Sequence, residues 1–273
     1  MRMKVFIVGA DSVVRMRREG QMRVSVETAN SVRVRVGACP AVFGRAPDDG
    51  EVLAWVVDLA TPPVDPDELF RWLTSEEQVR AQRYRIAKAR EQFVIGRGLL
   101  RGLLGAYLGT RPDAVELTYL PSRKPMLCDA TCGLHFNVTH TDGIAVLAVA
   151  RRRVGVDVEI VRPMRDADGL VGRYFSPAEC AAYRALPEDA KQAGFFRGWT
   201  TKEAVIKAAG ATVACLADFD VELNPSHPPG VLNARTELLA GDGWALAEWA
   251  AAGNVAVAVA LEGSDTLVIE NSI

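Results

Sequence analysis

The stretch Trp199-Thr-Thr-Lys-Glu-Ala-Val-Ile-Lys207, closed by Gly210, decides how the rest of the chain is interpreted. It predicts the last turns of a helix that begins near Lys191, because glycine commonly follows the final turn of a helix. At about 100° per residue, Glu203 falls inside the apolar face marked by Trp199 and Ile206. A carboxylate on that face needs a partner, since an unpaired buried charge is very costly. The helix is therefore predicted to carry a paired or functional carboxylate.

A second run, Val154-Gly-Val-Asp157-Val-Glu159-Ile160, alternates carboxylates with apolar residues. The period of two places Asp157 and Glu159 on one face of a strand. On the helix, Lys207 lies one turn beyond Glu203, and Lys202 borders the same face. Three acids and two lysines on a strand and a facing helix indicate a cation with a phosphate group. The same residues also fit a solvated edge strand and an ordinary i,i+4 ion pair.

Helix starts are marked in three places. Asp65 before Pro66 predicts a short helix, and Thr74-x-x-Glu77 predicts the start of a helical region that runs to about Gly109. Ser176-Pro-Ala-Glu179 is a further capping box, which we interpret as structural. Buried strands are predicted over 52–59 and 144–150, and a closing hairpin over 244–261.

These motifs resemble, in order and spacing, the signature of the 4′-phosphopantetheinyl transferases of the larger, surfactin-synthetase-activating type. Each motif alone is weak, but five in the right order are specific, and the resemblance covers roughly Glu51 to Glu262. The motifs are Lys124-Pro125, Phe136-Asn137-Val-Thr-His140-Thr141, Gly155-Val-Asp157-Val-Glu159, Phe175-Ser176-x-x-Glu179 and Trp199-Thr-x-Lys202-Glu203-Ala-x-x-Lys207.

The resemblance implies an α+β fold of two similar halves, a pseudo-dimer with the active site at the interface. The halves would be an N-terminal one at 51–151 and a C-terminal one at 152–262. Residues 1–48 lie outside the resemblance and fit an added edge strand, a carrier-binding arm or translated upstream sequence. Residues 263–273 are expected to be a peripheral tail.

The implied reaction is transfer of 4′-phosphopantetheine from coenzyme A to a serine of an apo acyl or peptidyl carrier protein. Adenosine 3′,5′-bisphosphate is released, and Mg²⁺, or Mn²⁺ in its place, assists. The pathway served, whether fatty acid, polyketide or nonribosomal peptide synthesis, is left open. Two alternatives use the same residues: a non-catalytic coenzyme A or nucleotide-binding module, and a metal-dependent phosphohydrolase that uses water.

The resemblance also implies roles for single residues. Asp157, Glu159 and Glu203 are the expected metal ligands, and Glu203 is expected to act as a metal ligand, as the base on serine, or as both. The expected catalytic residues are Glu203, Lys207 and His140. The expected coenzyme A-binding residues are Arg83, Arg90, Lys124, Thr139, His140, Lys202 and Lys207.

Composition excludes some classes of protein. The 273 residues carry a net charge of −2, which argues against a general nucleic-acid binder. The longest apolar runs, 144–150 and 255–261, are far shorter than a membrane span. Five cysteines without framework spacing are typical of a reducing compartment. We therefore expect a cytoplasmic monomer that acts on coenzyme A and carrier proteins.

Overall fold

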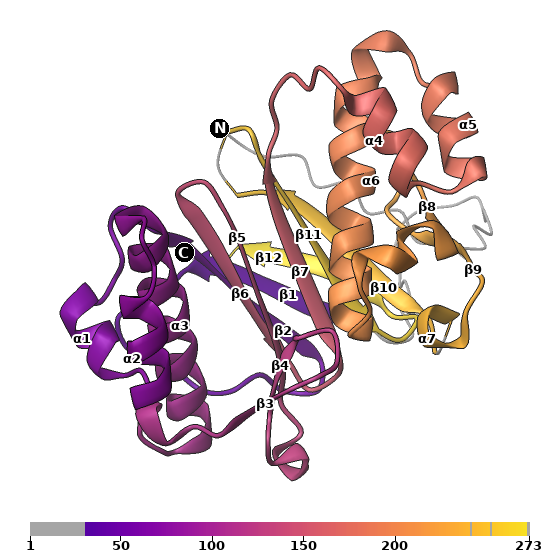
Figure 1. Cartoon of the computed structure of the whole chain (residues 1–273). Helices are drawn as coiled ribbons and strands as arrows, with labels where there is room; N and C mark the ends of the chain where they lie inside the picture. Colours follow the sequence, from indigo (N-terminus) through magenta and orange to yellow (C-terminus); the bar gives the residue numbers. More distant parts are fainter. Residues whose placement is uncertain (1–30, 241, 252, 272–273) are drawn as a thin grey trace, which may run out of the picture.

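The computed structural model describes residues 31–240, 242–251 and 253–271. The sequence prediction for residues 1–30 lies outside this range. The described chain is built in four layers (Figure 1): a layer of helices, a five-stranded sheet, a three-stranded sheet and a second layer of helices. This arrangement confirms the predicted mixture of helices and strands.

The five-stranded sheet is mixed. Its first three strands run parallel, the fourth pairs antiparallel with the third, and the fifth pairs antiparallel with the fourth. In the order in which they lie side by side, the strands are β12 (Thr266–Asn271), β1 (Ser31–Ala38), β2 (Glu51–Asp58), β6 (Ile144–Ala150) and β5 (His135–Thr141).

The three-stranded sheet is fully antiparallel and comes from the second part of the chain. Two small two-stranded sheets flank the main ones. The strands of the three-stranded sheet are β10 (Trp244–Ala250), β11 (Val255–Glu262) and β7 (Val154–Ile160), and the small sheets pair β3 (Leu117–Tyr119) with β4 (Pro125–Leu127) and β8 (Phe219–Val221) with β9 (Val231–Ala234).

Two long helices cover the outer faces of the main sheets. Both are 22 residues long and end at a left-handed glycine, Gly109 and Gly210. None of the helices in the described part is long and apolar enough to cross a bilayer. The helices are α1 (Pro66–Arg71), α2 (Ser75–Gln82), α3 (Ala87–Leu108), α4 (Ala167–Tyr174), α5 (Pro177–Ala185), α6 (Glu188–Ala209) and α7 (Glu237–Ala240).

Alternate side chains of a strand pack into two different cores. On β6, Val146 and Ala148 pack between the two sheets, whereas Leu147 and Val149 pack against α3. On β7, Val156 and Val158 face the five-stranded sheet, so the residues between them face α6. The predicted period of two on β7 is therefore confirmed, and it directs the carboxylates of this strand toward the long helix.

The structure differs from the sequence prediction at two places. The helical region predicted from Thr74 to Gly109 is broken between α2 and α3, and exposed residues such as Ile86 lie at the break. At the other end of the described chain, β12 from the predicted peripheral tail pairs with β1. β1 itself adds a strand beyond β2, as one of the alternatives for residues 1–48 supposes, although β12 and not β1 forms the edge. Pairing between such distant segments leaves no local pattern in the sequence. The proposed division at 151/152 stays a prediction.

Candidate active site

The candidate site lies where the edge strands of the two sheets meet. Strand β5 packs along β7, and their contact includes side chains as well as backbone. The Asn137 side-chain oxygen accepts the backbone N–H of Val156 at 2.9 Å, and Asn137 is buried. The side-chain amide of Asn137 thus supplies a hydrogen bond between the edge strands of two separate sheets. Sequence reasoning missed its role, although an asparagine inside an otherwise apolar strand is the signal that could have shown it.

Strand β7 also approaches α6 unusually closely. A Cβ atom at Gly155 would lie 2.1 Å from the Ala204 carbonyl oxygen and 2.4 Å from the Ala208 backbone nitrogen. Only glycine permits this approach, because any side chain would collide with the helix backbone. The residues two and four positions after Gly155, Asp157 and Glu159, are thereby held against the helix that carries Glu203.

Asp157, Lys207 and Thr139 form the centre of the site. The Lys207 ammonium donates to Asp157 Oδ1 at 2.5 Å and to the Thr139 hydroxyl at 3.3 Å. The Thr139 hydroxyl in turn donates to the same Asp157 oxygen at 3.1 Å. Residues from β5, β7 and α6 therefore converge on one carboxylate, which is only 6% exposed.

Glu203 and Glu159 complete the cluster. Glu203 Oε2 lies 3.8 Å from the Lys207 ammonium. Burial raises the pKa of Glu203 above its ordinary value; Lys207 opposes this shift, and the negative charges of Asp157 and Glu159 add to it. The pKa of Glu159 is raised for the same reasons, burial first and the Asp157 charge second. Burial likewise raises the pKa of Asp157, although Lys207 and Thr139 favour its charged form. A cation placed here would offset the negative charge of all three carboxylates and oppose the rise in their pKa values.

One buried oxygen of the cluster has no partner in the described structure. Asp157 Oδ2 is buried and makes no hydrogen bond there. Within residues 31–240, 242–251 and 253–271, no three or more His, Cys, Asp or Glu side chains are grouped so that they could hold a metal ion by themselves. Mg²⁺ does not require one, because it takes one or two carboxylates and fills its shell with water and phosphate oxygens. The orphaned oxygen and its acidic neighbours therefore fit a hard divalent cation.

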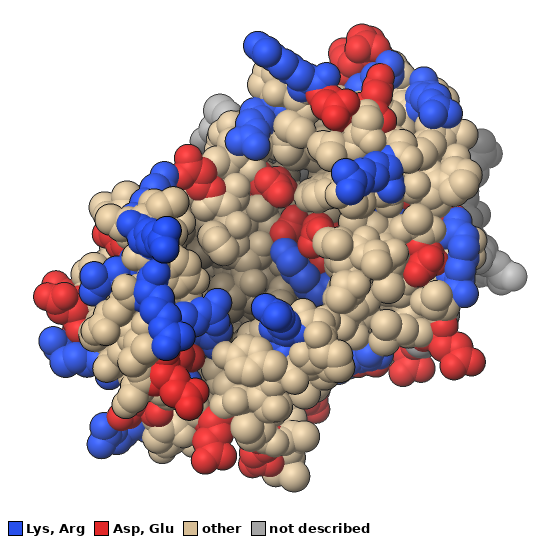
Figure 2. Space-filling view, viewed as in Figure 1, with Lys and Arg blue, Asp and Glu red and all other residues tan. Residues whose placement is uncertain are grey.

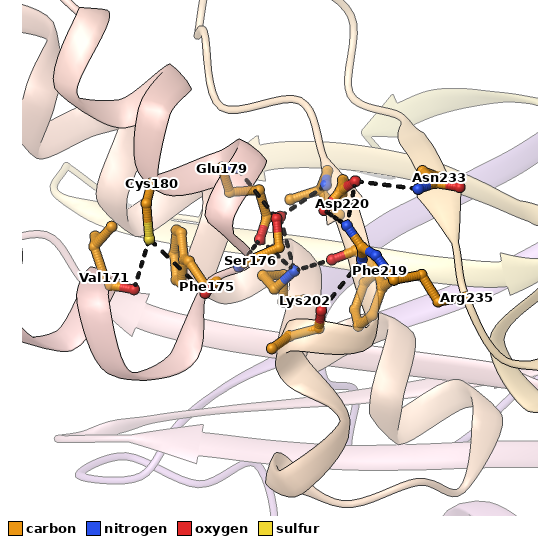
Figure 3. A network of polar contacts seen from close by, with 12 residues as sticks. Val171, Phe175, Ser176, Glu179, Cys180, Lys202, Phe219, Asp220, Asn233 and Arg235 are labelled. Atoms are coloured by element: carbon orange, nitrogen blue, oxygen red, sulfur yellow. Dashed lines mark hydrogen bonds and ion pairs between the residues drawn. The ribbon is translucent and has the colours of Figure 1, made fainter.

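The structure places Lys202 elsewhere (Figure 3). Its side chain is fully buried, and its ammonium donates to both Glu179 oxygens and to the Phe219 carbonyl oxygen. The same carboxylate closes the Ser176 capping box and accepts the Val221 N–H. The expected contact between Lys202 and a phosphate is therefore corrected. The Lys202 ammonium makes its hydrogen bonds inside the core, where they hold α6 against α5 and β8.

Lys124 is also occupied. Its ammonium donates to the carbonyl oxygens of Val154 and Ala208, both at 3.2 Å. These bonds tie the β3–β4 hairpin to the start of β7 and to the last turn of α6, where a positive charge is favoured. Burial lowers the pKa of Lys124 to about 8. Two of its three donors therefore serve the junction of the layers, and one remains for a ligand.

His140, Arg83 and Arg90 lie at the margin of the site. Thr139 faces β7, whereas Phe136 and Val138 pack into the core beside α3. The alternation of β5 thus puts the exposed His140 on the α3 side of the strand. Arg83 and Arg90 are exposed at the end of α2 and the start of α3. Figure 2 shows this face hollowed between the two helical layers, with acidic and basic side chains in the hollow.

Two family models match the chain. The model described as the 4′-phosphopantetheinyl transferase superfamily matches residues 153–260. The model described as 4′-phosphopantetheinyl transferase, N-terminal, matches residues 64–152. The two matches therefore adjoin one another and include every predicted site residue.

Several proteins are similar to this chain. The 4′-phosphopantetheinyl transferase HetI of a Nostoc species is 38% identical over 216 residues, which are 78% of this chain and 88% of the relative. A 4′-phosphopantetheinyl transferase of Bacillus subtilis is 26% identical over 160 residues, 58% of this chain and 70% of the relative. The solved structure of Thermotoga maritima holo-[acyl-carrier-protein] synthase matches with a TM-score of 0.33 and 19% identity, over 41% of this chain and 63% of that one.

Proposed function

This chain belongs to the 4′-phosphopantetheinyl transferase superfamily and is an enzyme of that class, and we propose that it transfers 4′-phosphopantetheine from coenzyme A to a serine of a carrier protein. The observation that carries the proposal is the convergence of Asp157, Glu203 and Lys207, from β7 and α6, on one point of the seam, the line along which the edge strands β5 and β7 meet. In the proposed fold, the chain parts on either side of this seam are the two halves of a pseudo-dimer.

In the proposed step, the serine oxygen of the carrier bonds to the phosphorus of the pantetheine phosphate. The bond from that phosphorus to the bridging oxygen breaks, and the bridging oxygen leaves with adenosine 3′,5′-bisphosphate. Glu203 receives the serine proton. Its carboxylate lies 3.8 Å from the Lys207 ammonium at the same point, and in its charged form it can accept that proton. Lys207 lies within reach of the same point and offsets negative charge on the phosphate oxygens.

Asp157, Glu159 and Glu203 would hold Mg²⁺. When bound, the ion supplies positive charge to the diphosphate at the breaking bond. The support is the orphaned Asp157 Oδ2, together with the burial and the mutual repulsion that raise the pKa of Glu159 and Glu203. Mn²⁺ prefers similar oxygen ligands and should replace it.

The basic residues on the α3 side would bind the nucleotide end of coenzyme A. Arg83 and Arg90 are exposed there, and charge-assisted hydrogen bonds to phosphate are strong. His140 would contact the diphosphate from the same side of β5. Lys124 would contribute its remaining donor, and Thr139 would orient Lys207 and Asp157. A cytoplasmic location and a monomeric state remain part of the proposal.

The test is the intact mass of apo-carrier proteins after incubation with this protein, coenzyme A and Mg²⁺. A panel of acyl and peptidyl carriers is run with and without a chelator. The expected result is a gain of one phosphopantetheine that the chelator abolishes. A carrier panel that gains no mass while coenzyme A still binds would contradict the proposed reaction and favour a non-catalytic binding module.

A further inference from the structure

The carboxylate cluster already contains a cation of its own. Lys207 Nζ lies 2.5 Å from Asp157 Oδ1 and 3.8 Å from Glu203 Oε2, and it contacts the Thr139 hydroxyl at 3.3 Å. One ammonium is thus the counter-ion of two carboxylates that belong to different elements. The opposite oxygen of Asp157 stays without a partner in the described structure.

This arrangement has an energetic consequence. A divalent cation that binds Asp157 and Glu203 brings its charge close to the Lys207 ammonium, and like charges at such distances repel. The repulsion is strong because Asp157 is buried and screening by salt is weak there. Lys207 is 28% exposed and has a flexible stem, so its ammonium can turn from the carboxylates toward a ligand in the hollow.

We propose that Lys207 is a built-in competitor of the divalent cation: its ammonium offsets part of the negative charge of the carboxylate cluster until a diphosphate draws it away. The inference rests on the proposed function, because it takes the metal and coenzyme A from there. The free protein then binds the metal weakly. Coenzyme A raises the metal affinity, because its diphosphate accepts the ammonium and leaves the carboxylates to the ion.

The coupling must be reciprocal. If coenzyme A raises the affinity for the metal by some factor, the metal raises the affinity for coenzyme A by the same factor. Removal of the Lys207 charge should therefore do two things at once. It should strengthen metal binding to the free protein, and it should reduce the factor by which coenzyme A helps.

The experiment measures Mn²⁺ binding by the electron paramagnetic resonance signal of the free ion, at mildly alkaline pH and without carrier protein. The full-length wild-type protein is compared with Lys207→Met, Lys207→Arg and Lys191→Met. Lys191 is the matched control: it lies on the same helix, has the same exposed fraction of 28%, and pairs with Glu188 outside the cluster. Each protein is titrated alone and with saturating coenzyme A.

We expect Lys207→Met to bind Mn²⁺ about tenfold more tightly than the wild type in the absence of coenzyme A. Lys207→Arg and Lys191→Met should match the wild type, because both keep a cation on Asp157. Coenzyme A should raise the Mn²⁺ affinity of the wild type by a larger factor than that of Lys207→Met. Unfolding midpoints, measured in parallel, establish that all four proteins are folded under the conditions used.

Equal Mn²⁺ affinity of Lys207→Met and wild type in the absence of coenzyme A would overturn the inference and leave the proposed function intact. An equal effect of coenzyme A on both proteins would also overturn it. Absence of Mn²⁺ binding to every variant, with and without coenzyme A, would overturn the metal assignment of the proposed function, and the inference with it.

Discussion

Replacement of Lys202 by methionine removes an ammonium that the structure buries completely. Its Nζ donates to the two oxygens of Glu179 at 2.7 and 2.8 Å and to the Phe219 carbonyl oxygen at 2.6 Å. Methionine has a similar volume but donates no hydrogen bond, so the Glu179 carboxylate, 2% exposed, loses its counter-ion. Removal of one partner of a buried pair costs about 3–5 kcal/mol.

The expected result is a fall of roughly 6–20 °C in the thermal midpoint, at about 2–4 °C for each kcal/mol in a chain of this size class. The assay is thermal unfolding followed by circular dichroism. Lys191→Met, which breaks a surface pair with Glu188 on the same helix, should melt like the wild type. Adding Glu179→Gln to Lys202→Met should recover part of the loss, because it removes the unpaired charge.

The same variant distinguishes a structural role of Lys202 in the core from a role in binding a phosphate of coenzyme A. In the structure-based account, the folded fraction of Lys202→Met binds coenzyme A with wild-type affinity. If the variant melted at the wild-type midpoint and bound coenzyme A much more weakly, the reasoning would be refuted. Lys202 would then be the phosphate ligand that the sequence motif suggested.

Three further outcomes are expected. Glu203→Gln keeps the volume of the side chain and removes its charge, so turnover should fall by about 10²–10⁴-fold while the Kd for coenzyme A, measured without metal, is unchanged. A loss of this affinity alone would make Glu203 a binding residue. Because burial raises the pKa of Glu203, the folded protein binds this proton more tightly than the unfolded one. The charged form therefore weakens the fold. In metal-free buffer, Glu203→Gln should have a higher thermal midpoint than the wild type at neutral pH, and this difference should vanish below the ordinary carboxyl pKa. A difference in midpoint that grew toward acidic pH would contradict the raised pKa. Gly155→Ala, whose Cβ would lie 2.1 Å from the Ala204 oxygen, should lose about 1–3 kcal/mol of stability. Gly96→Ala, with open space around its Cβ, should not lose stability. Equal melting of the two variants would contradict the close approach of β7 and α6.

The elements that hold the site could be predicted because their signals are local. The alternation of β7 and the glycine stop of α6 predicted a strand and a helix, and the structure confirms both. The capping box at Ser176 is present as well. Each of these features depends on residues a few positions apart, so the pattern can be read without knowledge of the tertiary fold.

Contacts between distant residues could not be predicted in the same way. Lys202 and Glu179 are 23 positions apart, and helical periodicity alone does not show that Lys202 points into the core while Lys207 points to the seam. The pairing of β12 with β1 joins opposite ends of the described chain, and both strands are too short to indicate a partner. Asn137 was read as part of a motif, yet its bond to Val156 depends on how two sheet edges meet.

The proposed transfer depends on the carboxylates that lie where β5 and β7 meet. The most direct test is the intact mass of an apo-carrier protein, one that the wild-type enzyme modifies, after a single turnover with Asp157→Asn. Asp189→Asn serves as the control, because Asp189 is exposed in the first turn of α6. The account predicts that Asp157→Asn leaves the carrier mass unchanged and that Asp189→Asn adds a phosphopantetheine at the wild-type rate. A wild-type rate from Asp157→Asn would contradict it.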